Sequence, residues 1–117
     1  MNMKIERESL NAVEFDGLVI RDYTAGRDGS SSMAEILVPA GARHKRSWSK
    51  RSNKYYYVVD GRLSFVIENR VLELSTGDVC IVFQGERFSY ENKTGEIAKL
   101  LLVHTPSFEL EEEVFEV

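Results

Sequence analysis

Short apolar runs follow one another along this chain, and turn residues separate them at close and fairly regular spacing. The runs are rich in Val, Ile, Leu, Tyr and Phe. Runs of this length and composition predict β-strands, and their succession is typical of an all-β sandwich or barrel. The predicted strands cover residues 33–38, 54–59, 63–67, 71–74, 79–83 and 98–104.

The segments between these runs contain turn-forming residues. Asp60-Gly61 predicts a two-residue hairpin, because a type I′ turn needs positive φ at both central residues. Further reversals are expected at residues 68–70 and 76–78. Residues 26–32 predict a flexible loop after an N-terminal strand around residues 17–23. The one candidate helix, residues 5–15, is short, so the fold class that we expect is all-β.

Composition narrows the class of protein. A chain of 117 residues with 43% hydrophobic and 29% charged residues is typical of one globular domain. No apolar run approaches the length of a membrane span, and the N-terminus lacks the apolar core of a signal peptide. We therefore expect a cytoplasmic protein without membrane association. The single cysteine, Cys80, lies in an apolar run and is interpreted as a buried, reduced residue.

The net charge of the chain is −4, but its charged residues are unevenly distributed along the sequence. Residues 43–54 contain six basic side chains, one histidine and no acidic residue, whereas residues 109–116 contain five glutamates. The basic segment is interpreted as a solvated loop that pairs with the acidic tail, within one chain or across a dimer. A surface for a partner is the alternative interpretation.

Two glycine-anchored blocks carry the most specific pattern. The first runs from Gly41 to Gly61 and contains Ser47-Trp48-Ser49 and Lys54. The second begins at Gly77 and continues through Phe83-Gln84-Gly85 and Phe88 to Asn92. Their spacing resembles the two motifs of the cupin family, G-x5-H-x-H-x(3,4)-E-x6-G and G-x5-P-x-G-x2-H-x3-N.

The resemblance covers roughly residues 33–106. It implies a cupin-type jelly-roll β-barrel, formed as a single domain, with a ligand pocket at one mouth of the barrel. On this basis residues 1–32 are N-terminal strands and a loop that pack on the barrel. Residues 33–106 form the barrel core, and residues 107–117 form an acidic C-terminal tail.

The resemblance also implies that four residues occupy the metal-ligand positions of the family. These are Ser47, Ser49, Lys54 and Phe88, where the family pattern has His, His, Glu and His. A lysine ammonium repels a cation, and a phenyl ring offers no lone pair. The sequence therefore predicts no metal and no other cofactor.

Replacing a glutamate by Lys54 inverts the charge of the implied pocket. We expect the pocket to bind a small anionic molecule, with hydroxyl donors from serine and with rings that cover an apolar part of the ligand. The predicted ligand-binding residues are Ser47, Ser49, Lys54, Tyr56, Phe88, Tyr90, His104 and Arg46. Two other interpretations are that Lys54 extends to water and that Phe83 and Phe88 fill the cavity.

Two further functions compete with a binding module. A metal-free sugar isomerase or epimerase would use Lys54 with Tyr56, Tyr90 or His104 as an acid–base pair. An interaction protein would use the basic residues 43–54, where Trp48 gives the charge-plus-aromatic pattern of single-stranded nucleic acid binders. The negative net charge of the chain and the shortness of the basic stretch disfavour nucleic acid as the partner.

We also expect a homodimer. Small cupins commonly pair through sheet edges, and the C-terminal tail contains an apolar face that suits either the barrel or a second subunit. This face is formed by Phe108, Leu110, Val114 and Phe115.

Overall fold

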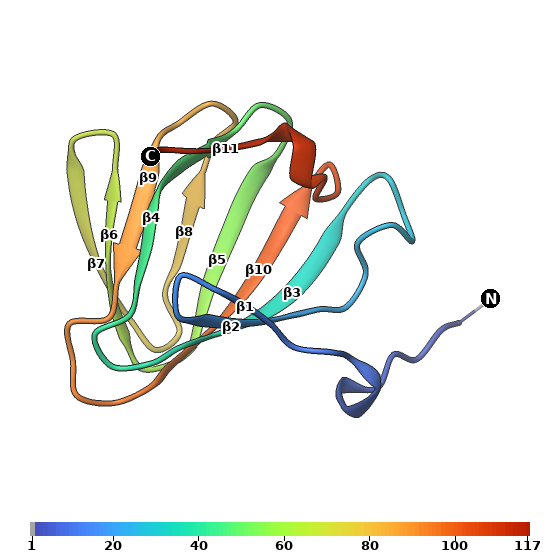
Figure 1. Ribbon diagram of the computed structural model, residues 1–117, viewed down its shortest axis with the longest axis horizontal. Coiled ribbons are helices and arrows are strands. Elements are labelled where there is room, and N and C mark those ends of the chain that lie inside the picture. Colours follow the sequence, from blue (N-terminus) through green and yellow to red (C-terminus); the bar gives the residue numbers. More distant parts are fainter. Residues whose placement is uncertain (1) are drawn as a thin grey trace.

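Two antiparallel β-sheets face each other in the computed structural model, which describes residues 2–117 (Figure 1). The six-stranded sheet has the order β1-β2-β3-β10-β5-β8, and the five-stranded sheet has the order β11-β4-β9-β6-β7. Strands that follow one another in the chain therefore often belong to different sheets. This arrangement is the all-β jelly roll that the sequence predicts.

The strands are short, and two single-turn 3₁₀ helices (η) accompany them. The elements are η1 (Arg7–Ser9), β1 (Val13–Phe15), β2 (Leu18–Asp22), β3 (Ser32–Val38), β4 (Arg43–Ser49), β5 (Asn53–Asp60), β6 (Arg62–Ile67), β7 (Arg70–Ser75), β8 (Val79–Val82), β9 (Phe88–Glu91), β10 (Ala98–Thr105), η2 (Leu110–Glu112) and β11 (Glu113–Phe115). Within residues 2–117, no helix is long and apolar enough to cross a membrane.

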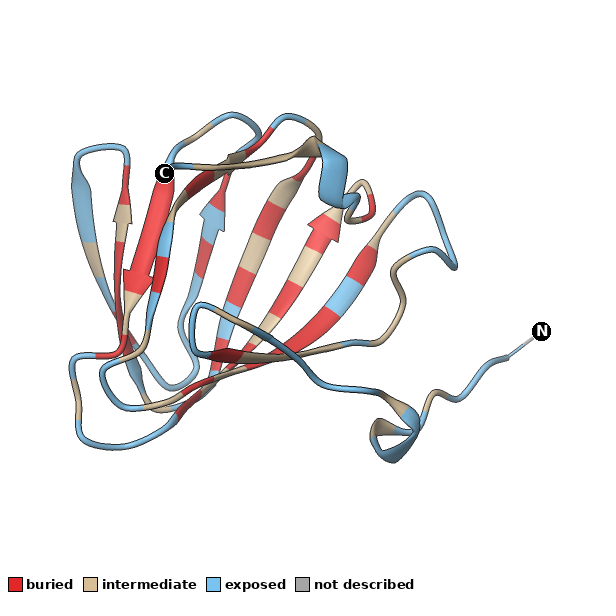
Figure 2. Ribbon diagram, in the orientation of Figure 1, coloured by how far each residue is buried: buried red, intermediate tan, exposed pale blue. Residues whose placement is uncertain are grey.

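The core lies between the two sheets. Side chains alternate along β10, where every second residue from Ala98 to His104 is buried (Figure 2). An aromatic cluster bridges the sheets, with ring centroids 4.7 Å apart for Phe65 and Tyr90 and 5.1 Å apart for Tyr56 and Phe65. These rings are almost fully buried. Their contacts close one end of the space between the sheets.

The hairpin predicted at Asp60-Gly61 is wrong. This pair connects β5 of one sheet to β6 of the other, so it forms a corner between sheets. Gly61 has a φ of 105°, and a Cβ at this position would lie 2.8 Å from the Cβ of Ala98. Glycine is required here for positive φ and for close approach of the two sheets. The reversal predicted at residues 68–70 is a true hairpin between β6 and β7.

The basic segment is a strand, where the sequence predicted a loop. β4 lies between β11 and β9 in the five-stranded sheet, and its inward positions are His44, Ser47 and Ser49. These inward residues are polar, so the strand leaves no trace in the hydrophobic pattern. Residues 5–15 do not form a helix either: they contain only η1 and β1.

Candidate functional site

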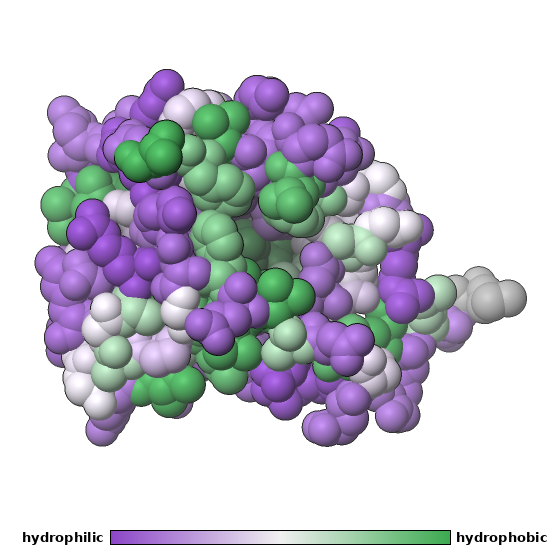
Figure 3. All heavy atoms as spheres, viewed as in Figure 1, coloured by the Kyte–Doolittle hydropathy of each residue, from purple (hydrophilic) through white to green (hydrophobic). Residues whose placement is uncertain are grey.

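A cavity of about 320 Å³ opens between the two sheets. The space-filling view shows the face turned to the reader hollowed in its middle, with apolar atoms in the hollow and polar atoms around it (Figure 3). In the ribbon, β11 crosses one side of this opening and β1 the other (Figure 1). A volume of this size suits a small organic molecule.

Both sheets and both terminal segments contribute to the cavity wall. Its titratable residues lie mostly on the inner strands, and the tail adds apolar side chains and one carboxylate. The wall is formed by Asn11, Val13, Phe15, Ile20, Asp22, Ser32, Ala34, Ile36, His44, Lys54, Tyr56, Tyr90, Leu102, His104, Phe108, Leu110, Glu113 and Phe115. The wall is therefore largely apolar, with a small group of buried polar side chains set into it.

His44 is held in one tautomer on the wall. Its Nδ1 lies 2.6 Å from the carbonyl oxygen of Lys45, and because a carbonyl only accepts, Nδ1 carries the proton. Nε2 is then left with its lone pair. The ring stacks on Phe88 and Tyr90, with centroids 5.2 Å and 5.0 Å away. Burial lowers the pKa of His44 to about 4, so the imidazole is neutral at pH 7.

Tyr90, whose ring stacks on this imidazole, carries a hydroxyl without a partner in the described part of the chain. The side chain is buried, and its hydroxyl oxygen has no hydrogen-bond partner among residues 2–117. Burial raises the pKa of Tyr90, and it also raises that of Tyr56 on the neighbouring part of the wall. Both phenols therefore remain protonated and can donate a hydrogen bond.

A second polar group combines three side chains from different parts of the chain. The ammonium of Lys54 donates to the Oε1 of Glu113 and lies 3.0 Å from the Nε2 of His104. Burial lowers the pKa of Lys54, and the charge and hydrogen bond of Glu113 oppose this shift. Burial, together with the lysine charge, lowers the pKa of His104 to about 3. A neutral His104 is thus an acceptor for the ammonium.

Four of the predicted site residues lie on the cavity wall: Lys54, Tyr56, Tyr90 and His104. Lys54 is only 5% exposed, so it does not extend to water. The prediction of an anionic ligand rested on the positive charge of Lys54, and in the structure the carboxylate of Glu113 pairs with this ammonium. A ligand role for these four residues remains a prediction.

The other four predicted residues do not line the cavity. Ser47 is buried where β11 pairs with β4, and the hydroxyl of Ser49 accepts from the backbone N–H of Ser52 at 2.9 Å. Phe88 is fully buried beneath His44. Arg46 lies on the outer side, 3.7 Å from Glu116 and 3.9 Å from Glu68.

Among the wall residues that the sequence did not predict, His44 and Glu113 matter most for the chemistry of the cavity. For His44, the sequence contains no clear signal, because the inward residues of β4 are polar and a register shift between His44 and Ser47 interrupts the alternation along the strand. For Glu113, the sequence contains no signal, because its position depends on β11 pairing with β4. Here Glu113 is directly opposite Ser49.

The residues at the family's metal-ligand positions do not fit a metal ion. Lys54 is already bound to a carboxylate, Phe88 has no donor atom, and the Ser49 hydroxyl is engaged by backbone N–H groups. Across the described part of the chain, no three His, Cys, Asp or Glu side chains gather as a metal site would require.

The basic segment is largely paired with acidic side chains. Arg51 lies 3.7 Å from Glu109, and Lys45 lies 3.7 Å from Asp16. The guanidinium of Arg87 stacks over the Trp48 ring at 4.1 Å, a cation–π contact that covers this face of the indole. The predicted pairing of this segment with the tail is confirmed within one chain, at Arg46, Arg51 and Lys54.

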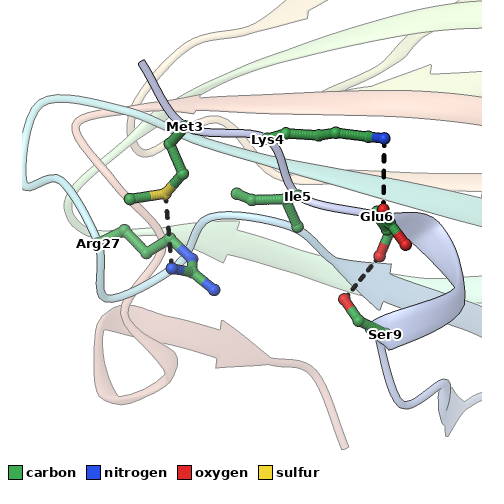
Figure 4. Close-up of a pocket in the computed structure, with 6 residues that line it drawn as sticks. All are labelled: Met3, Lys4, Ile5, Glu6, Ser9 and Arg27. Carbon is green, nitrogen blue, oxygen red and sulfur yellow. Dashed lines mark hydrogen bonds and ion pairs between the residues drawn. The ribbon is translucent and has the colours of Figure 1, made fainter. Parts of the chain in front are cut away.

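A second pocket of about 400 Å³ lies under the N-terminal segment (Figure 4). Its polar groups satisfy one another: Lys4 pairs with Glu6 at 3.3 Å, and the Ser9 hydroxyl donates to the Glu6 carbonyl at 2.6 Å. Arg27 faces the sulfur of Met3 at 3.6 Å. Because these side chains are largely exposed and mutually paired, the barrel cavity is the stronger candidate site.

Comparison with known proteins places this geometry in a family. Residues 34–104 match the family model described as Cupin domain. No curated protein matches the chain in sequence.

Solved structures share the fold over almost the whole chain. A variant of Streptomyces PAC13 with uridine has a TM-score of 0.87 at 21% identity, and the match covers 100% of this chain and 92% of that one. KdgF from Halomonas sp. has a TM-score of 0.82 at 13% identity, with 93% and 97% covered. A predicted oxalate decarboxylase from Thermotoga maritima has a TM-score of 0.80 at 17% identity, with 89% and 99% covered.

Proposed function

This chain belongs to the cupin domain family, and from that premise we propose that its cavity is a metal-independent acid–base site. The proposed ligand is a small neutral molecule that carries a ring and hydroxyl groups. The proposal is that the protein moves protons on this molecule, as in a dehydration or an epimerisation.

One observation carries the proposal: a neutral imidazole and an unpaired phenol stand side by side in an apolar cavity. His44 presents the lone pair of Nε2, since Nδ1 donates to the carbonyl of Lys45. Tyr90 offers a hydroxyl whose proton has no partner among residues 2–117. A base that is neutral at pH 7 and an acid that keeps its proton are the two groups that general acid–base catalysis needs.

The chemistry follows from these protonation states. The Nε2 of His44 takes a proton from a carbon next to a carbonyl, and the C–H electron pair forms a C=C bond. The hydroxyl on the neighbouring carbon leaves as water, with its proton supplied by Tyr90 or by the Lys54 ammonium. If a proton is instead delivered to the opposite face of the same carbon, the outcome is epimerisation. An ammonium beside the developing enolate oxygen would stabilise its negative charge.

Solved structures of similar fold support this class of chemistry by analogy. Pac13 is described as a unique nucleoside dehydratase, and its variants with a His-to-Gln or a Tyr-to-Phe replacement were solved with uridine. The present chain brings two histidines and two tyrosines, His44, His104, Tyr56 and Tyr90, to the wall of one cavity. Nucleosides and sugars are therefore the first substrates to test.

A neutral ligand is preferred over the anion that the sequence predicted. Lys54 and Glu113 together carry no net charge, and the remaining wall residues are apolar or neutral apart from Asp22 at its edge. An anion would have to compete with Glu113 for the ammonium. An anionic ligand remains the alternative, and the experiments below distinguish the two.

The test is proton exchange in D₂O, which ¹H NMR monitors. The protein is incubated with sugars or nucleosides in which a carbonyl is followed by a carbon that carries a hydrogen and then by a carbon that carries a hydroxyl. We expect loss of the signal of the C–H next to the carbonyl, or a new alkene signal. His44→Gln should slow this by about 100-fold or more, the usual contribution of a general base.

Tyr57→Phe is the matched control, since Tyr57 lies on the outer face of β5 and is 41% exposed. It should behave like the wild type, whereas Tyr90→Phe should be slower. Equal exchange in the wild type and His44→Gln would refute the proposed base. No exchange in a protein that binds these molecules would leave a binding module, without catalysis.

A further inference from the structure

Two buried oxygen atoms at the cavity have no partner. Three buried side-chain polar atoms within residues 2–117 make no hydrogen bond, and two of them, the Tyr90 hydroxyl and the Oε2 of Glu113, belong to cavity-wall residues. The Glu113 side chain is only 3% exposed. An unpaired carboxylate oxygen in such a place is costly, because burial removes its water without replacing the hydrogen bonds.

The two oxygens of Glu113 have different roles. Oε1 accepts from the Lys54 ammonium, which in turn donates toward the Nε2 of His104 at 3.0 Å. This pairing neutralises the cation that would otherwise attract an anion into the cavity. Oε2 remains a charged acceptor without a donor. A ligand with a hydroxyl or an N–H group would supply the missing donor in a charge-assisted hydrogen bond.

The backbone holds Glu113 at this position. β11 pairs with β4 so that Glu113 lies opposite Ser49 and Phe115 lies opposite Ser47. The amide of Lys50 donates to the Glu112 carbonyl at 2.8 Å, and the amide of Glu116 donates to the Arg46 carbonyl at 2.9 Å. Alternation along the strand directs Glu113 and Phe115 to the same side, where both line the cavity.

We propose that Glu113 is the specificity-determining residue of this cavity. It selects a neutral ligand that offers a hydroxyl or N–H donor, and it rejects carboxylates and phosphates by occupying Lys54. The proposal depends on the cavity being the binding site, as proposed above, but not on proton transfer at His44. It assigns the tail a direct part in recognition.

The experiment compares Glu113→Gln with the wild type, using two kinds of probe. Uridine is the neutral probe, and acetate and uridine 5′-monophosphate are the anionic probes, each titrated by NMR and calorimetry. Glu113→Gln should bind uridine about tenfold more weakly, because a neutral amide replaces a charge-assisted acceptor. It should bind the anions at least tenfold more tightly than the wild type, because Lys54 is released.

Glu111→Gln is the matched control. It removes the same charge from the same tail, but Glu111 is exposed and is not part of the cavity wall. It should bind all three probes as the wild type does. A wild-type protein that binds acetate or the monophosphate more tightly than uridine would overturn the proposal, as would unchanged binding of uridine and the anions in Glu113→Gln.

A second variant covers the case in which Glu113→Gln does not fold. Lys54→Met combined with Glu113→Gln removes both charges, so it should bind anions no better than the wild type and should still bind uridine weakly. Full uridine affinity in this double variant would overturn the role of Glu113. Proton exchange that persists with altered ligand selectivity would support both proposals. Lost exchange with intact selectivity would refute only the chemistry at His44.

Discussion

The Nε2 of His104 lies 3.0 Å from the ammonium nitrogen of Lys54, at the inner face of the six-stranded sheet. The two residues are directly opposite each other in the pairing of β10 with β5. His104 accepts from the lysine, and Glu113 supplies the countercharge from the other sheet. The charged group at the cavity is therefore assembled from two neighbouring strands and the tail, and several measurable properties depend on it.

Removing one partner of the Lys54–Glu113 pair should destabilise the protein strongly. In Lys54→Met, Glu113 becomes a buried charge without a partner, which costs about 3–5 kcal/mol. Replacing both residues by apolar ones of similar size, Lys54→Met with Glu113→Leu, should cost much less, because no charge remains buried. Urea unfolding of the two single variants and the double variant gives the coupling free energy. Additive losses would show that the pair does not interact.

As the pH is lowered, the fold should lose stability at a higher pH than protonation of its carboxylates alone would cause. The pKa is lowered to about 4 for His44 and to about 3 for His104, below the ordinary value of 6.5. The unfolded state therefore binds more protons below pH 6.5, so stability is full above that pH and falls as the pH drops toward 4 and then 3. For His44 the loss is on the order of 3 kcal/mol.

Urea unfolding at pH 7.5, 6 and 5 measures this slope. Burial is the main cause of the lowered pKa of His44. The charges nearby act in opposite directions, because those of Lys54 and Lys45 disfavour protonation and that of Asp16 favours it. His44→Gln and His104→Gln should each flatten the slope between pH 6.5 and 5. A slope that stays the same in both variants would contradict the assignment to histidine.

Tyr90→Phe should weaken ligand binding without lowering the stability of the fold. It removes a buried hydroxyl without a protein partner, so the free energy of unfolding should stay the same or rise by up to about 1 kcal/mol. Uridine binding should weaken in the same variant. Thermal unfolding and calorimetric titration provide the two readouts. A clear loss of stability would mean that the hydroxyl is satisfied within the folded protein.

Gly61→Ala should be far more harmful than Gly77→Ala. Both glycines have positive φ, 105° and 92°, so both substitutions strain the backbone by about 1 kcal/mol or more. Only at Gly61 would the added methyl clash, 2.8 Å from Ala98, whereas nothing lies within 4 Å at Gly77. We expect a total loss of roughly 3 kcal/mol or more for Gly61→Ala. Equal losses in denaturant unfolding would show that the corner can move apart.

The homodimer remains a prediction, and β8 is the strand through which to test it. β8 forms the edge of the six-stranded sheet, with Val79, Ile81 and Phe83 exposed along and just beyond it. Light scattering should give twice the chain mass for the wild type, and Ile81→Lys should give the monomer mass. Val71→Lys, on β7 at the edge of the five-stranded sheet, is the control and should remain dimeric. A monomeric wild type would contradict the prediction.

How well the sequence predicts a residue of the candidate site depends on the strand that carries it. Lys54, Tyr56 and His104 lie on strands that the apolar runs of the sequence predicted, and the period of two along a strand places Lys54 and Tyr56 on one face. Ser47 and Ser49 are also buried, but their cross-strand neighbours in β11, Phe115 and Glu113, line the cavity in their place. Sequence spacing places a residue on a strand face, and it does not show what covers that face.

By itself, the sequence determined the all-β class, the strands with apolar alternation and the family to which the barrel belongs. It determined these because the period of two along a strand and the turn residues between strands are local features of the sequence. The tertiary structure alone decided that Asp60-Gly61 connects two sheets, that the basic segment is a strand, and that Glu113 neutralises Lys54. Residue 113 lies 59 positions from residue 54, and only the pairing of β11 with β4 brings their charges together.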